Sequence, residues 1–165
     1  MTIKSFDQKS LAGLRFDRDD TGEDARVAEL LRAEMAARFG PRDERPLSIR
    51  AQDADGAMVG GLNGVTHWRW LYVRHLWVEQ AWRGRGLGRR LLERAEASAQ
   101  ERDCVGVYID TFDPGAAAFY ERSGFARFGA IDDFPKGSQR IYLSKKLGEA
   151  APPPCPSPAS GKSGR

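Results

Sequence analysis

The residues best suited to chemistry gather in one short run, Arg83-Gly84-Arg85-Gly86-Leu87-Gly88. Glycine lets a backbone approach a ligand closely, and the first turn of a helix leaves backbone N–H groups without internal partners. The arginines add positive charge at the same place. If a strand precedes this run and a helix follows it, the run is typical of a site that holds an anion such as a pyrophosphate.

The charge of the predicted helix start supports this interpretation. Arg89 and Arg90 extend the cationic run into the helix, although a helix N-terminus ordinarily attracts acidic residues. The alternative is a solvated basic turn whose glycines only permit tight packing. The spacing is neither that of a P-loop, which ends in Lys-Ser/Thr, nor the GxGxxG of a dinucleotide fold.

The elements on either side have the order that an anion site needs. Residues 69–78 are rich in β-branched and aromatic side chains, as strands are, and Leu87, Leu91, Leu92, Ala95 and Ala99 recur at helical spacing. We expect this helix to end near residue 102. Residues 105–111 then alternate like a strand that buries Val107 and Ile109 on one face.

Local signals place the remaining elements. Gly40-Pro41 ends a helix over residues 24–39, Asp53-Ala54-Asp55-Gly56 is a hairpin turn signal, and Pro114 suits the first turn of a short helix. The predicted elements are a strand at 11–17, a hairpin of 47–52 with 57–65, a helix from 114 to 123, and a final strand pair at 125–131 and 139–147.

Composition indicates one domain and excludes several classes of protein. The 165 residues are 41% hydrophobic and 30% charged with a net charge of +3, which falls short of the dense basic surface of a nucleic-acid binder. No apolar run could span a membrane and no signal peptide is evident, so the expected location is cytoplasmic. We expect a loose leader at 1–10, the domain at 11–148 and a disordered Pro/Ser-rich tail at 149–165.

Histidine and cysteine usage gives no sign of a metal or of disulfides. Cys104 and Cys155 lie far apart, the second in the proline-rich tail. His67 and His75 are isolated from any cluster at metal-ligand spacing. We therefore predict no metal site.

Three motifs in a fixed order carry a resemblance to a known family: Arg83-x-x-Gly86-x-Gly88 after a strand, residues 113–120, and the run FYERSGF at 119–125. Together they resemble the GNAT superfamily of N-acetyltransferases over about residues 47–147. The resemblance implies an α/β (mixed α+β), acyl-CoA N-acyltransferase-like fold, with a twisted mixed sheet of about six to seven strands and helices on both faces. It also implies that the strands at 69–78 and 105–111 splay apart and that acetyl-CoA lies in the opening.

The family pattern implies which residues hold the cofactor. The backbone of Leu76, Trp77 and Val78 would pair with the pantetheine arm of acetyl-CoA. The pyrophosphate would lie on the loop formed by Arg83, Gly84, Arg85, Gly86, Gly88 and Arg89. Asp113 occupies a position where many members carry Asn, so its carboxylate either contacts the cofactor or caps the following helix.

The same resemblance implies the catalytic residues. Tyr120 matches the tyrosine beside the CoA sulfur, where it would protonate the departing thiolate. Glu79 is the first choice for the base that accepts the amine proton, and His75, Asp110 and an ordered water remain alternatives. Trp68, Trp70 and Trp77 either wall a substrate pocket or belong to the core.

The expected function is therefore transfer of an acetyl group from acetyl-CoA to a primary amine of a small molecule, by direct attack in a ternary complex. The alternatives are a peptide or protein-lysine acetyltransferase and a noncatalytic acyl-CoA-binding module. The turn at Asp132-Asp133 either gives an acidic mouth for a cationic amine or is simply solvated. The sequence leaves a homodimer open and gives no sign of a nucleic-acid or membrane partner.

Overall fold

A computed structural model describes residues 12–148 of the chain, and these divide into two units, residues 12–41 and 42–148. Each unit is described by itself. The predicted leader at 1–10 and tail at 149–165 lie outside the described residues.

The described residues of the first unit include one helix, α1 (Ala25–Phe39). Asp24 caps its N-terminus by accepting a hydrogen bond from the Arg26 backbone N–H at 2.8 Å, and Gly40 ends it with a positive φ of 80°. The predicted helix at 24–39 is confirmed. The predicted strand at 11–17 is wrong over its described part, because Ala12 and Gly13 form a turn and no strand pairs with the residues that follow.

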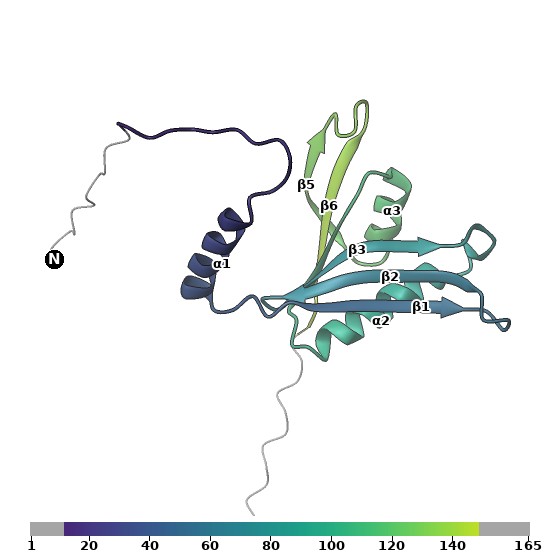
Figure 1. The fold of residues 1–165 in the computed structure, drawn as a ribbon. Coiled ribbons are helices and arrows are strands. Elements are labelled where there is room, and N and C mark those ends of the chain that lie inside the picture. The colour runs from purple at the N-terminus through teal and green to yellow at the C-terminus, as the bar shows by residue number, and fades with distance from the viewer. Residues whose placement is uncertain (1–11, 149–165) are drawn as a thin grey trace, which may run out of the picture. The chain divides into compact units, whose positions relative to one another are not determined.

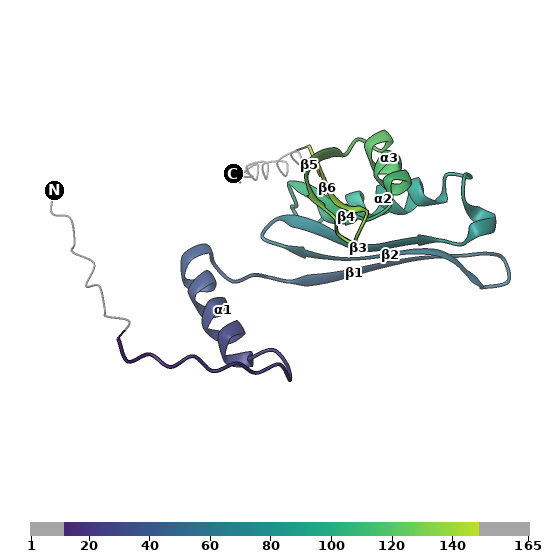
Figure 2. The same cartoon turned by 90° about the horizontal axis from the view of Figure 1, so that it is seen from above.

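The second unit is built on one six-stranded mixed sheet (Figure 1). Its strands lie in the order β1-β2-β3-β4-β6-β5, and only β3 and β4 run parallel. This confirms the predicted mixed α/β fold class, whereas the two longer helices of this unit lie on one face of the sheet and not on both (Figure 2). The strands are β1 (Arg45–Gln52), β2 (Met58–His67), β3 (Trp70–Val78), β4 (Gly106–Thr111), β5 (Ala126–Asp132) and β6 (Gln139–Lys146).

The turn between β1 and β2 forms for a local reason. The Asp53 carboxylate accepts hydrogen bonds from the backbone N–H groups of Asp55 and Ala57, at 3.1 and 2.8 Å. Gly56 has a φ of 81°, which a side chain would strain. The hairpin predicted at this turn is therefore confirmed, with strands at 45–52 and 58–67 in place of 47–52 and 57–65.

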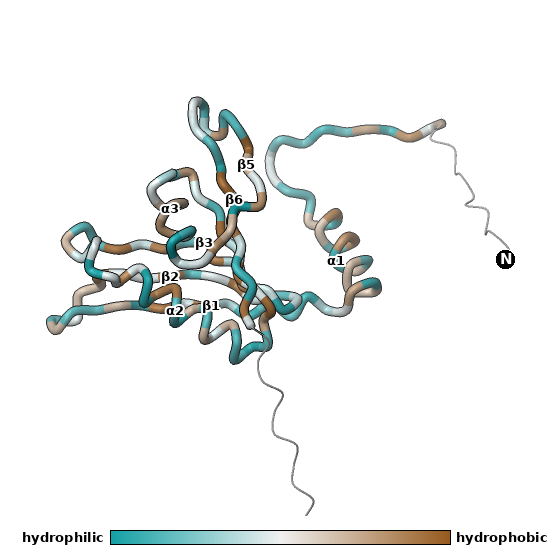
Figure 3. The backbone as a smooth tube through the Cα atoms, turned by 180° about the vertical axis from the view of Figure 1, so that it is seen from behind, coloured by the Kyte–Doolittle hydropathy of each residue, from teal (hydrophilic) through white to brown (hydrophobic). Residues whose placement is uncertain are grey.

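Two helices of the second unit, α2 (Leu87–Gln100) and α3 (Pro114–Arg122), lie on the same face of the sheet (Figure 2). A short 3-10 helix, η1 (Gln80–Trp82), joins β3 to the glycine run. The core between sheet and helices includes Leu71, Val73, Leu91, Leu92, Val107 and Leu143, each at most 2% exposed. Figure 3 shows hydrophobic residues along the central strands. Burying one such side chain completely stabilises the folded protein by about 1.5–3 kcal/mol.

A bulge in β3 sets the geometry of the site. The register of β3 on β2 shifts at Arg74, so this residue is the extra one in its strand. The parallel ladder of β3 with β4 ends at the pair Val73 and Ile109, immediately before the bulge. Beyond it, Leu76 and Val78 lie on the helix-covered side, as Val73 does, while β3 and β4 no longer pair.

Candidate active site

A cleft of about 660 Å³ lies between the end of β3, the glycine run with the start of α2, and α3. Most residues predicted to hold a cofactor line it, together with several that the sequence did not single out. The lining residues are Leu76, Trp77, Val78, Trp82, Arg83, Gly84, Gly86, Leu87, Gly88, Arg89, Asp113, Ala116, Phe119, Tyr120, Arg122 and Ser123.

The glycine run presents open backbone N–H groups to the cleft. Gly84 and Gly86 have φ angles of 71° and 83°, so the loop turns through the left-handed region before the helix begins. The first bond of α2 runs from the Arg90 N–H to the Gly86 carbonyl at 3.1 Å. The preceding N–H groups therefore have no carbonyl of their own helix to bond, which is the arrangement that binds anions.

Gly88 lets the cleft walls come together. A β-carbon at this position would lie 3.3 Å from the Phe119 ring of α3 and 3.7 Å from a Val78 methyl of β3. A glycine therefore allows α2 to start close to both walls.

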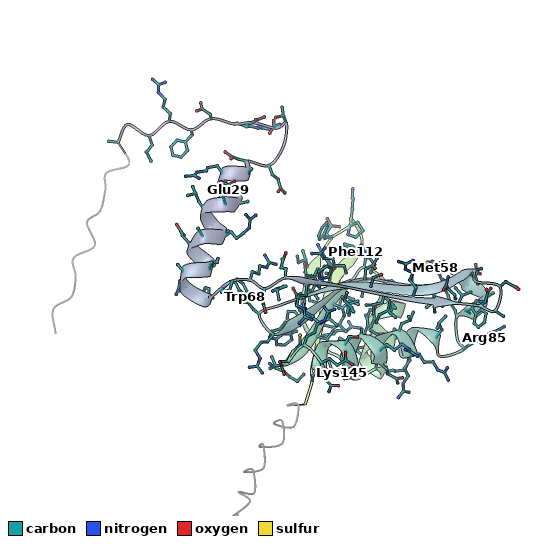
Figure 4. The ribbon with its side chains drawn as sticks, turned by 60° about the horizontal axis from the view of Figure 1, so that its bottom comes forward. Glu29, Met58, Trp68, Arg85, Phe112 and Lys145 are labelled. Atoms are coloured by element: carbon teal, nitrogen blue, oxygen red, sulfur yellow. The ribbon has the colours of Figure 1, made fainter. Side chains whose placement is uncertain are left out.

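The arginines of the run are partly engaged. The Arg83 Nε donates to the Val78 carbonyl at 3.0 Å, which ties the loop to the end of β3. Arg89 pairs with Glu93 at 2.9 Å, and the Arg85 guanidinium lies 5.8 Å from the centre of the Trp82 ring. Arg85 is not among the lining residues, and Figure 4 labels it in the loop between β3 and α2.

The wall formed by α3 could have been found from the sequence by its period. Asp113, Ala116, Phe119, Tyr120 and Ser123 line the cleft at the i, i+3, i+4 spacing of one helix face. Arg122 joins them at the end of the helix and adds a cation that sequence reasoning missed. Arg122 stands in the last turn of α3, where the helix dipole favours a cation. Its position in the sequence was therefore explained by the helix alone and did not point to the cleft.

Tyr120 lies at the base of the cleft. It is 6% exposed and packs against Phe119 and Phe125, with ring centres 5.2 and 5.9 Å away. Burial raises the pKa of Tyr120 to about 12, and the carboxylates of Asp113 and Asp110 add to the effect. The hydroxyl therefore keeps its proton at neutral pH and can donate it.

Asp113 caps α3. Its carboxylate accepts a hydrogen bond from the Gly115 backbone N–H at 2.8 Å, and its own N–H donates to the Thr111 hydroxyl at 3.1 Å. Of the two roles considered for this residue, the geometry provides the cap. A direct contact between Asp113 and a cofactor stays a prediction.

Glu79 is placed differently from the other predicted site residues. Its carboxylate accepts the backbone N–H of Ala81 at 2.7 Å and caps η1, and Glu79 is not among the lining residues. The alternative base His75 is exposed on the opposite side of the sheet, in a second groove shared with Trp77 and Asn63.

Asp110, the other alternative base, has both carboxylate oxygens occupied. Oδ1 accepts the Tyr72 hydroxyl and Oδ2 accepts the Arg140 Nε, each at 2.7 Å, and the side chain is only 12% exposed. Burial alone would raise the pKa of the Asp110 carboxyl, but the hydrogen bonds from Arg140 and Tyr72 outweigh it and hold this pKa below its ordinary value. Such a carboxylate is a weak base.

Comparison with known proteins identifies the family of this chain. The model of the acetyltransferase (GNAT) family matches residues 15–125. The chain belongs to the GNAT family of acetyltransferases. The family expected from the motifs is thereby confirmed, and the chain is an acetyl-CoA-dependent acetyltransferase.

Three similar proteins place this acetyltransferase within its family. It is 39% identical to acetyltransferase Atu2258 of Agrobacterium fabrum over 128 residues, which are 78% of this chain and 93% of that protein. It is 42% identical to the blasticidin-S acetyltransferase of Streptomyces morookaense over 109 residues, 64% of this chain and 80% of that one. A crystal structure of an acetyltransferase from Agrobacterium tumefaciens superposes with a TM-score of 0.73 at 37% identity and covers 81% of this chain and 100% of that one.

Two further observations concern the described residues of this acetyltransferase. Between residues 12 and 148, no helix is long and apolar enough to cross a membrane. Over the same residues, no group of three or more His, Cys, Asp or Glu side chains is arranged to hold a metal ion.

Proposed function

We propose that this acetyltransferase binds acetyl-CoA in the cleft and transfers the acetyl group to a primary amine of a small molecule by direct attack in a ternary complex. The observation that carries the proposal is that one cleft joins the open N–H groups at the start of α2 to the Tyr120 hydroxyl. A relative named for acetylating blasticidin S supports a small-molecule acceptor.

The cofactor would lie along three walls. The pyrophosphate would accept hydrogen bonds from the N–H groups of Leu87, Gly88 and Arg89, with the helix dipole and nearby guanidinium groups adding positive charge. The pantetheine arm would lie along Leu76 and Val78, where β3 no longer pairs with β4, although the Val78 carbonyl already accepts the Arg83 Nε. This brings the thioester toward Tyr120 from the phosphate end.

The reaction needs a donor for the thioester oxygen and a proton for the sulfur. The amine nitrogen attacks the thioester carbon, and a β3 backbone N–H near Val78 would stabilise the negative oxygen that forms, a contribution typically worth about 10²–10³ in rate. When the C–S bond breaks, the thiolate takes the Tyr120 proton and the acetyl group stays on nitrogen. The nitrogen then loses its extra proton.

Water is the proposed acceptor of that proton. The carboxylates of Glu79 and Asp110 already accept hydrogen bonds from the protein, and His75 lines a separate groove with Asn63 and Trp77. An ordered water between the strands can remove the proton without a dedicated side chain.

The cytoplasmic location and a homodimer stay predictions.

The test is product analysis with a panel of acceptors. The protein is incubated with acetyl-CoA and with small primary amines, blasticidin S and lysine-containing peptides, and the products are identified by mass spectrometry. We expect N-acetylated small amines. Faster acetylation of the peptides would favour a peptide acetyltransferase, and acetyl-CoA binding without any N-acetyl product would favour a binding module.

A further inference from the structure

On the sheet face opposite the cleft, an arginine has a guanidinium group whose terminal nitrogens are not hydrogen-bonded to the described residues. Arg140 of β6 uses only its Nε for Asp110, at 2.7 Å. Among residues 12–148, nothing in the protein bonds to its two terminal nitrogens, Nη1 and Nη2. The guanidinium lies 5.3–5.7 Å from the ring centres of three aromatic residues, Phe112, Phe134 and Tyr142.

A purely structural ion pair would be built differently. Arginine usually meets a carboxylate with two parallel N–H···O bonds, whereas here the second oxygen of Asp110 accepts the Tyr72 hydroxyl. The outer edge of the guanidinium is therefore left for another partner. The Arg140 side chain is 29% exposed, and Phe112 and Phe134 beside it are 44% and 43% exposed.

The charges nearest to this edge are already engaged. The Asp110 carboxylate is paired with Arg140 itself. The carboxylates of the neighbouring turn accept hydrogen bonds from groups in and beside that turn. Asp133 accepts the Gly137 N–H at 2.7 Å, and Asp132 accepts the Gln139 side-chain amide at 2.5 Å. These bonds favour the interpretation of Asp132-Asp133 as a structural turn rather than as an acidic mouth for a cation.

The position of the cluster relates it to the reaction. Asp110 is the first β4 residue beyond the last β3–β4 pair, Val73 and Ile109, so Arg140 and its aromatic neighbours flank the point where the strands diverge. Phe112 comes two residues after Asp110 and directly before Asp113 of the cleft wall. Figure 4 labels Phe112 among the side chains of the sheet.

We propose that Arg140 binds a carboxylate carried by the acceptor, while Phe112 and Phe134 contact the apolar body between that carboxylate and the amine. The acceptor class is thus an amino acid or another amine with a carboxylate, instead of a simple cationic amine. This inference rests on the proposed function, because it assigns the acceptor side of the same reaction.

The experiment compares para-aminomethylbenzoate with benzylamine, which differ only in the carboxylate. Hydrogen bonds to a charged group contribute about 1.5–3 kcal/mol, so we expect kcat/KM of the wild-type protein to favour the carboxylated amine by at least about tenfold. In Arg140→Gln this ratio should fall to about one. Arg140→Lys should give an intermediate ratio, because lysine keeps the charge but loses the planar fork.

Arg127→Gln is the matched control. Arg127 lies on the neighbouring strand β5 and pairs with Glu121 at 2.6 Å, so its loss should leave the ratio unchanged. A wild-type ratio near one, or an equal loss for both amines in Arg140→Gln, would overturn the proposal. If Arg140→Gln fails to fold, Arg140→Lys takes its place, and a wild-type ratio in that variant would overturn the proposal.

Direct binding separates this inference from the proposed function. Binding of para-aminomethylbenzoate and benzylamine to the CoA-loaded protein is measured by calorimetry. If neither amine is acetylated, yet the carboxylated one binds more tightly and loses this advantage in Arg140→Gln, the acceptor site stands and the proposed reaction fails. If the carboxylated amine does not bind more tightly, the acceptor site is wrong whatever the catalytic activity.

Discussion

At the scale of single residues, the Tyr120 hydroxyl is the sharpest test of the chemistry. Its pKa is raised to about 12 by burial, which keeps it protonated at neutral pH and also makes it a weaker acid than an exposed tyrosine. Tyr120→Phe keeps the ring that packs against Phe119 and Phe125. We expect the single-turnover rate at saturating acetyl-CoA to fall by about 10²–10⁴-fold, with Tm and acetyl-CoA affinity nearly unchanged.

Tyr108→Phe is the control for that experiment. Its hydroxyl lies 3.3 Å from the His67 imidazole on the opposite face of the sheet, so the variant also loses one tyrosine hydroxyl. Its turnover should stay near that of the wild-type protein. A Tyr120→Phe rate similar to that of Tyr108→Phe would return Tyr120 to a packing role.

Glu79 is the residue whose predicted role and observed contact differ most. Its carboxylate caps η1, and glutamine can accept the same Ala81 N–H through its side-chain carbonyl. The variant keeps the cap and loses only the ability to act as a base, which the proposed reaction assigns to water. We therefore expect Glu79→Gln to keep kcat/KM within about twofold of the wild-type value from about pH 6 to pH 9. A loss of tenfold or more at the acidic end alone would make Glu79 the base after all.

Asp110 gives a prediction about stability and pH. The pKa of Asp110 in the folded protein lies below the ordinary aspartate pKa. The ion pair therefore stabilises the protein at any pH above the ordinary pKa, and this stabilisation is lost as the pH falls through the folded-state pKa. Asp110→Asn should lower the unfolding free energy at neutral pH by about 1–3 kcal/mol, because an amide cannot replace the charged acceptor for Arg140.

Urea unfolding at a series of pH values checks this prediction. The difference between Asp110→Asn and the wild-type protein should shrink as pH falls below the ordinary aspartate range. A difference that stays constant at all pH values would mean that the carboxylate charge contributes nothing and that shape alone explains the loss.

At the scale of elements, the start of α2 connects backbone conformation to ligand binding. Gly86 caps the helix with a φ of 83°, where a side chain costs about 1–2 kcal/mol. Gly86→Ala can relieve that strain only by turning the loop and its N–H groups. We expect its Kd for acetyl-CoA to rise about tenfold or more by calorimetry.

Gly129→Ala in β5 is the matched control, since a β-carbon there meets nothing within 4 Å. It should bind acetyl-CoA as the wild-type protein does. If Gly86→Ala binds equally well, the loop conformation does not set the anion site.

Elements with local signals could be predicted from the sequence. The β1–β2 turn depends on Asp53 and Gly56, and α3 depends on Asp113 and Pro114, all within a few residues of the element that they fix. The strand expected at 11–17 failed because a strand also needs a partner, which a local pattern does not reveal. The bulge at Arg74 could not be predicted for the same reason, since it is a property of register between two strands.

At the scale of the whole molecule, the cleft could be predicted better than the opposite face. The cleft residues follow one another in ordered motifs, and a family resemblance places them together. The cluster of Tyr72, Asp110 and Arg140 joins three strands, and nothing near any one of these residues in sequence indicates the other two. Sheet order and register decide such contacts, so they needed the structure.

The last prediction concerns cooperative stability. Acetyl-CoA would contact β3, the loop before α2, and α3, segments that are far apart in the chain, so binding should stabilise the second unit as a whole. A ligand at about 100 times its Kd adds about 2.7 kcal/mol by mass action, which for a chain of this size raises Tm by roughly 5–11 °C.

Thermal unfolding with acetyl-CoA, CoA and NAD measures this effect. CoA should act nearly as well as acetyl-CoA, because the phosphate and pantetheine contacts are shared, and NAD should act weakly, since it has a pyrophosphate but no pantetheine arm. Added salt should reduce the shift, because screening weakens the contribution of the arginines around the cleft. A Tm shift as large with NAD as with acetyl-CoA would mean that the cleft recognises a pyrophosphate alone, and the assignment of Leu76 and Val78 to the pantetheine arm would then be wrong.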